Sequence, residues 1–263
     1  MYTCIQKRTK LYKMIDMDFD EIMQACKRDY RPFRQDVPFI RRPRSLIDSI
    51  KAAKEDGRRP VIAEIKPASP TAGQIRSVPD PARLASDYAC GGACGVSVLT
   101  EPRYFRGSLE NLRLASQAKV PALRKDFLFD PAQIKESYFY GADSLLLISS
   151  FFDAEPLARM IAGCREYGIE PLVEVHDEDD IERSRVAGAL LYAINNRDRH
   201  TLQVDRSRTA RLSRGIDGTT VSASGISTRA QLDEALAHCD AALVGTALMA
   251  SADPGKALKE LIW

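Results

Sequence analysis

The stretch Val61-Ile-Ala-Glu-Ile-Lys-Pro-Ala-Ser-Pro70 decides how the rest of the chain is interpreted. Its first residues are apolar and predict a buried strand, which runs into two charges, Glu64 and Lys66. Side chains two residues apart on a strand point to the same side, and burying ions is costly unless they are paired. Prolines then end the strand and open a loop, where binding groups usually lie. Alone, the stretch fits either a structural ion pair or the edge of a functional site.

The same unit, an apolar strand followed by a helical pattern, recurs along the chain. The predicted strands are nearly uniformly apolar, as parallel strands buried on both faces are, and they lie at 61–65, 95–99, 120–123, 143–148, 171–175, 190–194, 219–223 and 241–245. Helical patterns between them include 81–90, 109–118, 131–140, 155–167 and 228–237. Eight such units predict an α/β protein folded as a single (β/α)8 barrel, a TIM barrel.

The rival fold is an open, doubly wound sheet. Such a sheet usually carries a glycine-rich dinucleotide turn after its first strand, and residues 66–74 contain no G-x-G-x-x-G pattern. Helical patterns at 18–30 and from Ser45 to Gly57 precede the first strand, joined by an irregular segment rich in Pro and Arg. We therefore expect two parts: a leader and helical extension over 1–59, packed on a barrel over 60–263.

Composition excludes several classes of protein. The 263 residues carry 38 basic and 36 acidic side chains, a formal net charge of +2, without the basic block that a nucleic-acid binder needs. No apolar run is long enough to cross a membrane, and the basic leader, residues 1–13, lacks the apolar region of a signal peptide. Cys90 and Cys94 have a metal-like spacing but no second Cys or His pair nearby, so we expect no metal site and reduced thiols in the cytoplasm.

Polar residues stand where seven of the eight apolar strands end, which is the edge that forms the active site of such barrels. We expect Glu101 and Asp126 to be solvated loop charges, whereas most of the others are candidates for a site. The set comprises Glu64, Lys66, Thr100, Glu101, Arg124, Lys125, Asp126, Glu174, His176, Asn195, Asn196, Arg197, Ser222, Ser224, Gly245 and Thr246.

Two of these strand ends have the composition of anion sites. Ser224-Gly225 and Gly245-Thr246 are expected to open the helices after the seventh and eighth strands. Glycine lets backbone N–H groups approach an anion, and a helix N-terminus adds a favourable dipole. Phosphate commonly binds after these two strands. The pattern predicts a phosphorylated small-molecule substrate, with ordinary tight turns as the alternative.

Two lysines and a glutamate in one pocket suit proton transfers on a carbonyl or imine. Neighbouring cations lower a lysine's pKa and burial raises a glutamate's, so each group can serve as an acid or a base. A lysine could instead form a Schiff base, as in barrel aldolases. Spacing alone leaves both routes open, as it does a protein that binds a phosphorylated ligand without catalysis.

The ordered set of strand-end motifs resembles the indole-3-glycerol-phosphate synthase family of tryptophan biosynthesis. The likeness runs through the barrel from about residue 45 to 250, and the helical segment before it resembles that family's N-terminal extension. The matching stretches are Ala63-Glu-Ile-Lys-Pro-Ala-Ser-Pro70, Leu99-Thr-Glu101, Tyr104-Phe-Arg-Gly107, Leu123-Arg-Lys-Asp-Phe127, Leu172-Val-Glu-Val-His176, Ile194-Asn-Asn-Arg-Asp198, Ser224-Gly-Ile226 and Leu243-Val-Gly-Thr246. A second class of enzyme, an isomerase or aldolase on another sugar phosphate such as phosphoribosylanthranilate isomerase, is the alternative, but the Cys/Asp arrangement of that isomerase is not matched.

The resemblance implies ring closure with decarboxylation and dehydration of 1-(2-carboxyphenylamino)-1-deoxyribulose 5-phosphate, without a metal or organic cofactor. It implies that Lys125 is the general acid, that Lys66 holds the anthranilate carboxylate and that Glu174 serves dehydration. Glu64 and Asn195 would orient a lysine and substrate hydroxyls.

The resemblance also implies the binding residues. The phosphate would be surrounded by Ser69, Ser224, Gly225, Gly245 and Thr246, with Arg197 in the same binding set, and the aromatic ring by Phe105, Pro70 and Leu146. The partner would be a small anion with a carboxylate and a phosphate, and the protein a monomer or weak homodimer.

The chain departs from the family at the end of the seventh strand. The family typically reads Glu-Ser-Gly there, and this chain reads Ala223-Ser224-Gly225. Loss of that carboxylate leaves the pocket more positive, which lowers lysine pKa values. Three explanations are a weakened synthase, a paralogue acting on or binding another sugar phosphate, and an engineered variant. We hypothesise that Glu64 partly replaces the missing carboxylate.

Overall fold

The structure, a computed structural model, describes residues 19–36, 38 and 41–263. Eight parallel strands close into a barrel in which each strand pairs with the next along the chain and the first pairs with the last, with two short strands outside it. This confirms the predicted barrel. Its strands are β1 (Val61–Ile65), β4 (Gly95–Leu99), β5 (Ala122–Lys125), β6 (Ser144–Ile148), β7 (Glu170–Val175), β8 (Leu191–Asn195), β9 (Thr219–Ala223) and β10 (Ala241–Val244).

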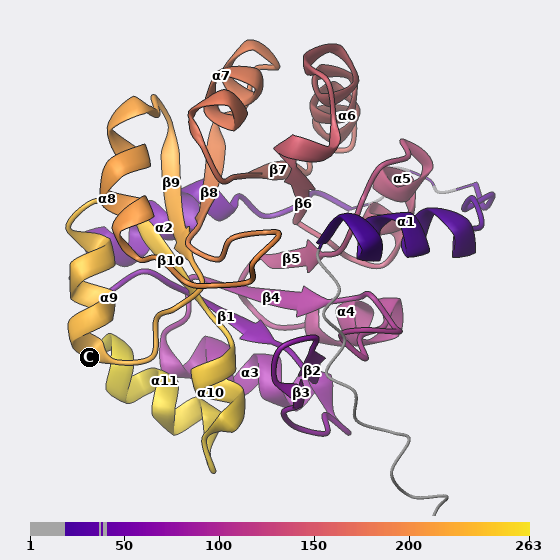
Figure 1. The fold of residues 1–263 in the computed structure, drawn as a ribbon. Coiled ribbons are helices and arrows are strands. Elements are labelled where there is room, and N and C mark those ends of the chain that lie inside the picture. Colours follow the sequence, from indigo (N-terminus) through magenta and orange to yellow (C-terminus); the bar gives the residue numbers. More distant parts are fainter. Residues whose placement is uncertain (1–18, 37, 39–40) are drawn as a thin grey trace, which may run out of the picture.

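Helices surround the barrel (Figure 1). Most begin at a side chain that accepts a hydrogen bond from a backbone N–H of the first turn, as Asp80 does at α3 and Asp177 at α7. The outer helices are α3 (Pro81–Gly91), α4 (Leu109–Ala115), α5 (Ala132–Phe139), α6 (Ala154–Glu166), α7 (Glu178–Val186), α8 (Ser207–Leu212), α9 (Arg229–Leu236), α10 (Thr246–Ala250) and α11 (Pro254–Ile262), with 3-10 turns η1 (Ser149–Phe151) and η2 (Ser213–Gly215).

Alternation along β1 explains which side chains face the inside of the barrel. Val61, Ala63 and Ile65 belong to the apolar layer between strands and helices, whereas Ile62 belongs to the apolar cluster inside the barrel. Residues that differ by two share a face. Glu64 therefore points inward, above a floor of apolar side chains.

The strand predicted at 120–123 lies two residues further along, at Ala122–Lys125. Pro121 has no N–H to donate to a ladder, and it stands just before the strand, where only its carbonyl is used, by the N–H of Val96. The shift makes Lys125 the last residue of the strand, opposite Leu99 of β4.

The part of the extension nearest the barrel, α2 (Leu46–Glu55), packs on the apolar interior cluster through Leu46 and Ile50. Its N-terminus is held by the Glu170 carboxylate, which accepts hydrogen bonds from Ser45 Oγ at 2.6 Å and from the N–H groups of Leu46 and Ile47 at 2.7 and 3.0 Å. Glu170 begins β7. The helix is thereby fixed to the end of the barrel opposite the strand C-termini. The expected division between 59 and 60 falls between α2 and β1.

The other helix of the extension, α1 (Phe19–Asp29), lies near the C-terminal ends of the strands (Figure 1). The Phe19 N–H donates to the carbonyl of Arg199 at 3.1 Å, and its ring meets that of Phe127 edge-on with centroids 5.9 Å apart. Both expected helices of the extension are confirmed, whereas the leader, residues 1–13, lies outside the described residues.

A two-stranded antiparallel hairpin, β2 (Ala68–Ser69) and β3 (Gly73–Gln74), follows β1 where the sequence predicts only a loop. The turn residue Gly73 has a φ of +64°, which glycine adopts at little cost. The hairpin holds Ser69 and Pro70 in one position beside the barrel mouth.

None of the described helices combines the length and apolarity needed to cross a bilayer. No group of three or more His, Cys, Asp or Glu side chains in this part of the chain is placed to hold a metal ion. Five cysteines are free thiols, among them Cys90 and Cys94, and Cys4 lies outside the described residues.

Candidate active site

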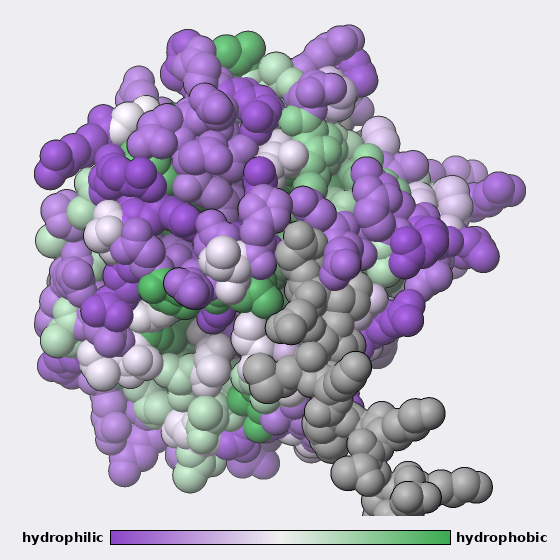
Figure 2. All heavy atoms as spheres, viewed as in Figure 1, coloured by the Kyte–Doolittle hydropathy of each residue, from purple (hydrophilic) through white to green (hydrophobic). Residues whose placement is uncertain are grey.

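A cavity of about 350 Å³ opens at the C-terminal ends of the barrel strands. Figure 2 shows this face of the molecule as mostly hydrophilic, with hydrophobic side chains exposed in separate patches. The cavity brings together all fourteen residues that the sequence analysis predicts for the site, from the eight barrel strands and the loops after them. They are Glu64, Lys66, Ser69, Pro70, Phe105, Lys125, Leu146, Glu174, Asn195, Arg197, Ser224, Gly225, Gly245 and Thr246.

Glu64 bridges the two lysines of the pocket. The Lys66 Nζ lies 3.6 Å from Oε1 and the Lys125 Nζ lies 3.8 Å from Oε2, while Ser97 Oγ donates to Oε2 at 3.3 Å. A Cβ on Gly245 would lie 2.5 Å from Glu64 Oε1 and 3.1 Å from Glu64 Cβ, so any other residue there would displace the Glu64 side chain. The glycine at the end of β10 thus makes room for the carboxylate that pairs the lysines.

The environment of Lys66 favours loss of its proton. Burial lowers its pKa and outweighs the opposing effect of Glu64, and the nearby Lys125 and Arg197 lower the pKa further. Burial also lowers the pKa of Arg197. An anionic ligand would relieve this concentration of buried positive charge.

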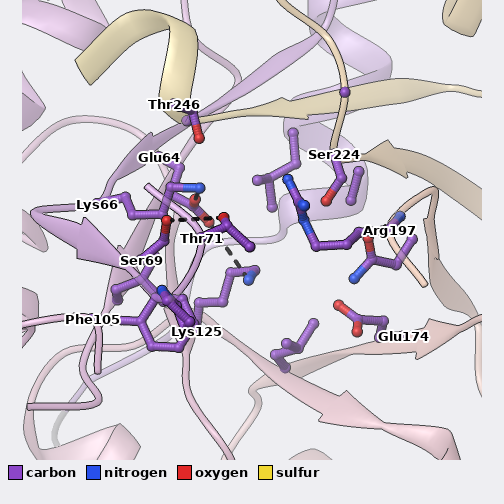
Figure 3. A pocket seen from close by; sticks show the side chains of 18 of the residues that line it. Glu64, Lys66, Ser69, Thr71, Phe105, Lys125, Glu174, Arg197, Ser224 and Thr246 are labelled. Atoms are coloured by element: carbon purple, nitrogen blue, oxygen red, sulfur yellow. Dashed lines mark hydrogen bonds and ion pairs between the residues drawn. The ribbon is translucent and has the colours of Figure 1, made fainter. Parts of the chain in front are cut away.

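Glu174 and Arg197 lie across the pocket from Glu64, Lys66 and Lys125 (Figure 3). Glu174 is 1% exposed and sits near the end of β7. Asn195 Oδ1 accepts the N–H of Arg197 at 3.0 Å, and the Arg197 guanidinium donates to the carbonyl of Leu202 at 2.6 Å. A carboxylate and a lysine therefore face the same space from opposite walls.

Ser224 and Gly225 follow β9 with consecutive positive φ angles of 72° and 80°. At Gly225 a Cβ would lie 2.4 Å from Cγ1 of Val204, so only glycine fits under the loop after β8. The expectation that this pair opens the next helix is wrong. α9 begins at Arg229, because Thr228 and Gln231 form a capping box and because two left-handed residues cannot continue into a helix.

Ser69 and Thr246 complete this side of the pocket. Ser69 Oγ accepts the N–H of Ala72 at 3.1 Å and lies 3.4 Å from Thr71 Oγ1. Thr246 is the first residue of α10, directly after Gly245, as the sequence predicts. Hydroxyl groups and closely approaching backbone therefore line this part of the cavity.

The apolar wall is larger than the sequence indicates. Phe105 and Leu146 line it as predicted, together with Phe127 and Phe19. The rings of Phe105 and Phe127 have centroids 6.2 Å apart. The alternation from Lys125 could have identified Phe127, but nothing in the sequence brings Phe19, in a helix before the barrel, to this wall.

Several of the polar strand-end residues do not reach the pocket. Arg124 points into the helix layer, where it pairs with Asp126 at 3.1 Å and Glu136 at 2.8 Å. Asn196 and Ser222 hydrogen-bond each other and Thr209 of α8. A position one residue away along a strand faces the opposite side.

The expectation of solvated charges at Glu101 and Asp126 is wrong. Glu101 is 3% exposed and accepts the N–H groups of Arg103, Tyr104 and Phe105 at 2.6 to 3.0 Å. Asp126 accepts from Thr100 and pairs with Arg124. Glu101 therefore organises the loop that carries Phe105 to the apolar wall.

Ala223 lines the pocket and is 4% exposed, between Asn195 of β8 and Leu243 of β10 in the strand register. Among the described lining residues the carboxylates are Glu64, Asp126 and Glu174. Since Asp126 is taken up by Arg124, Glu64 is the carboxylate of this set that contacts the lysines.

Comparisons with known proteins point to one family. A family model described as "Indole-3-glycerol phosphate synthase" matches residues 11–261. The chain is similar to the indole-3-glycerol phosphate synthase of Dehalococcoides mccartyi, with 43% identity over 220 residues, 80% of this chain and 85% of that protein. It is also similar to that of Campylobacter jejuni strain RM1221, with 37% identity over 262 residues, 94% of this chain and all of that protein.

Solved structures share the fold at much lower identity. A tryptophan synthase alpha chain from Legionella pneumophila has a TM-score of 0.59 and 14% identity, over 82% of this chain and 95% of that chain. A 3-hexulose-6-phosphate synthase has a TM-score of 0.63 and 16% identity, over 77% of this chain and 97% of that chain. At these identities the likeness extends to the barrel architecture alone.

Proposed function

Because the chain belongs to the indole-3-glycerol phosphate synthase family, we propose that it performs the indole-forming step of tryptophan biosynthesis. The substrate is 1-(2-carboxyphenylamino)-1-deoxyribulose 5-phosphate, and the products are indole-3-glycerol phosphate, CO2 and water. Breaking a carbon–carbon bond with loss of CO2 makes the enzyme a carboxy-lyase. The observation that carries the proposal is the family match along nearly the whole chain, supported by a pocket that holds every predicted site residue.

In the first step we assign the ketone oxygen to Lys125. The ring carbon that bears the carboxylate attacks the ketone carbon, and the developing alkoxide takes a proton from the Lys125 ammonium. Lys66 binds the carboxylate until CO2 leaves. The pairing of both ammonium groups with Glu64 supports these roles, because one carboxylate fixes both lysines.

In the last step we assign dehydration to Glu174. Its carboxyl gives a proton to the departing hydroxyl, which leaves as water. The adjacent carbon of the new ring then loses a proton to the Glu174 carboxylate, so the ring becomes aromatic and the carboxyl is restored. The position of Glu174 across the pocket from Lys125 supports this division of labour (Figure 3). Asn195 and Glu64 orient the substrate hydroxyls and the lysines.

The two ends of the substrate have separate binding groups in this proposal. Phe105, Pro70 and Leu146 enclose the aromatic ring. The phosphate is bound by Ser69, Ser224, Gly225, Gly245, Thr246 and the nearby Arg197. The hydroxyls that line this side of the pocket and the start of α10 at Thr246 support this assignment, because hydroxyl groups and the free N–H groups of a helix N-terminus donate to an anion.

We further propose that the enzyme acts in the cytoplasm as a monomer or weak homodimer, with protein side chains alone supplying the acid–base chemistry. Size-exclusion chromatography with light scattering over a range of concentrations tests the oligomeric state. A stable dimer at nanomolar concentration would contradict this part of the proposal.

The decisive experiment is a fluorescence assay for indole-3-glycerol phosphate, run on the parent protein, Ala223→Glu and Lys125→Ala. We expect turnover by the parent and a loss of at least about 100-fold in kcat for Lys125→Ala, the usual effect of removing a general acid. A gain in Ala223→Glu would show that the missing carboxylate limits the rate. No product from either the parent or Ala223→Glu would contradict the proposal and favour another sugar phosphate.

A further inference from the structure

A buried histidine lies directly behind the proposed dehydration carboxyl. His176 Nε2 is 3.4 Å from Glu174 Oε1, and His176 Nδ1 is 3.6 Å from Asp180 Oδ2. The exposed fractions of Glu174, His176 and Asp180 are 1%, 6% and 1%. His176 follows Glu174 by two residues at the end of β7, so both side chains point to the same side. The imidazole therefore stands between two buried carboxyl groups, one of which lines the pocket.

Asp180 is held in place from two further directions. Arg183 donates to Oδ1 at 2.6 Å, and the backbone N–H of His176 donates to Oδ2 at 3.0 Å. Burial alone would raise the pKa of Asp180, but the contacts with His176 and Arg183 outweigh it and hold the pKa below its ordinary value. Asp180 is thus a fixed carboxylate on the side of the ring away from the pocket.

Three of the atoms in this arrangement lack a hydrogen bond of ordinary geometry within the described part of the chain: Glu174 Oε1 and both ring nitrogens of His176. Buried polar atoms nearly always have a partner. Here each unpartnered atom faces another polar atom at 3.4 to 3.6 Å, so small side-chain adjustments form both bonds.

The number of protons on the imidazole of His176 determines which atom donates in each of these two hydrogen bonds. With Asp180 ionised, Nδ1 carries a proton and donates it to Oδ2. The opposite nitrogen then either accepts a proton from the Glu174 carboxylic acid or donates one to its carboxylate. In both forms one proton lies between Nε2 and Oε1, which leaves Oε2 of Glu174 directed at the pocket.

We propose that His176 is a positioning residue for Glu174, anchored by Asp180, that fixes one carboxyl oxygen through a shared proton and leaves the other for the substrate. The proposal rests on the proposed function only in the role given to Glu174. Arg183, which pairs with Asp180, is part of the same anchor.

Steady-state kinetics of His176→Ala and His176→Gln test this role, with the exposed His238→Ala as the matched control. We expect His176→Ala to lower kcat about 10- to 100-fold, the usual effect of losing a group that orients an active side chain, and to leave KM within about two-fold. The amide of His176→Gln can donate to Oε1, so this variant should recover most of the lost kcat. His238→Ala should match the parent. Parent-like kcat in His176→Ala, equal losses in both His176 variants, or a rise in KM instead of a fall in kcat would overturn the proposal.

A second readout does not depend on turnover and separates this proposal from the proposed function. The chain has three histidines, so ¹⁵N labelling of their rings gives few signals, and the signal lost in His176→Ala identifies the relevant ring. We expect Glu174→Gln to shift the Nε2 resonance of His176, because the partner of the shared proton has changed. An unchanged resonance would contradict the proposal even if the protein made no indole-3-glycerol phosphate.

Discussion

At the scale of single residues, one carboxylate of the pocket, Glu64, pairs with two lysines. Glu64 contacts both Lys66 and Lys125, and Ala223 stands where the resemblance described in the sequence analysis leads us to expect a glutamate. A second carboxylate near two buried ammonium groups would share the task of keeping them charged and in place. Glu64 therefore has no substitute among the described lining residues, since Glu174 faces the lysines from across the pocket.

Glu64→Gln tests this dependence. The amide keeps the shape but removes the charge, so we expect kcat/KM to fall by about 100-fold or more, equivalent to about 3 kcal/mol of lost transition-state stabilisation. The same change in a family member that keeps the strand-seven glutamate is the control, and there the loss should be smaller. Equal losses in the two proteins would show that Glu64 does not replace the missing carboxylate.

Lys66 gives a second test at this scale, through the pH dependence of stability. Its pKa in the folded protein lies below the ordinary value of 10.5, chiefly because of burial. Between the lowered pKa and 10.5 the unfolded chain binds more protons than the folded one, so the free energy of unfolding rises with pH in this range. The destabilisation caused by burying the charged Lys66 is therefore complete below the folded-state pKa and disappears as the pH rises toward 10.5. We expect Lys66→Met to be stabilised relative to the parent more at pH 7 than at pH 10.

Urea unfolding at the two pH values measures this difference directly. Lys51→Met, which removes a lysine from an exposed position of α2 rather than from the pocket, is the control for loss of a lysine side chain. A Lys66→Met difference that stays constant or widens at pH 10 would show that the buried ammonium carries no such cost.

At the scale of elements, the sequence predicts the strands and helices that a repeated pattern of residues defines. It fails where one or two residues set the boundary of an element. The barrel strands were readable because each is a short apolar run between helices. The third strand was displaced by Pro121, and the hairpin at Ala68–Gln74 was missed because two residues per strand show no alternation. The sequence predicts that α9 starts at Ser224-Gly225, but the capping box that starts the helix is at Thr228, four residues after Ser224.

The same limits apply to the site. All fourteen predicted residues line one cavity, because polar groups at the ends of parallel strands converge on one side of a barrel. The members of the wider set that do not line the cavity, such as Arg124 and Asn196, stand next to members that do and differ from them in which side of the strand they face. Phe19 could not be predicted, since its position depends on the path of the chain between α1 and α2.

The anchoring of α2 by Glu170 gives the prediction at this scale. Glu170→Gln removes a charge that accepts two N–H groups and a hydroxyl at a helix N-terminus. We expect a loss of about 1–2 kcal/mol in the free energy of unfolding, by analogy with lost helix caps and charge–dipole contacts. The measurement is urea unfolding at pH 7 with an unchanged m-value. Glu166→Gln, at an exposed position of α6, is the control, and an equal effect of both changes would contradict the assigned role.

At the scale of the whole molecule, the extension contacts both ends of the barrel. α2 packs against the apolar floor, and α1 lies at the mouth, where Phe19 reaches the cavity (Figure 1). The apolar side chains inside the barrel and the polar side chains at its mouth thus form two layers. The first stabilises the fold, and the second carries the proposed chemistry. A change at Phe19, where α1 reaches the cavity, should therefore affect catalysis more than folding.

Phe19→Ala tests whether α1 contributes to substrate binding or to the stability of the fold. Phe19 contributes an aromatic face to the cavity next to Phe127, and its removal exposes that wall to water. Losing about 1.4 kcal/mol of apolar contact with the aromatic end of the substrate raises KM about ten-fold, while kcat changes little because the lysines and Glu174 are untouched. The melting temperature should fall by no more than a few degrees, since Phe19 is only half-buried and packs at the edge of the interior cluster. Phe139→Ala, at an exposed ring on α5, controls for loss of an aromatic side chain and should leave KM unchanged. A large fall in melting temperature with an unchanged KM would mean that α1 stabilises the barrel rather than the bound substrate.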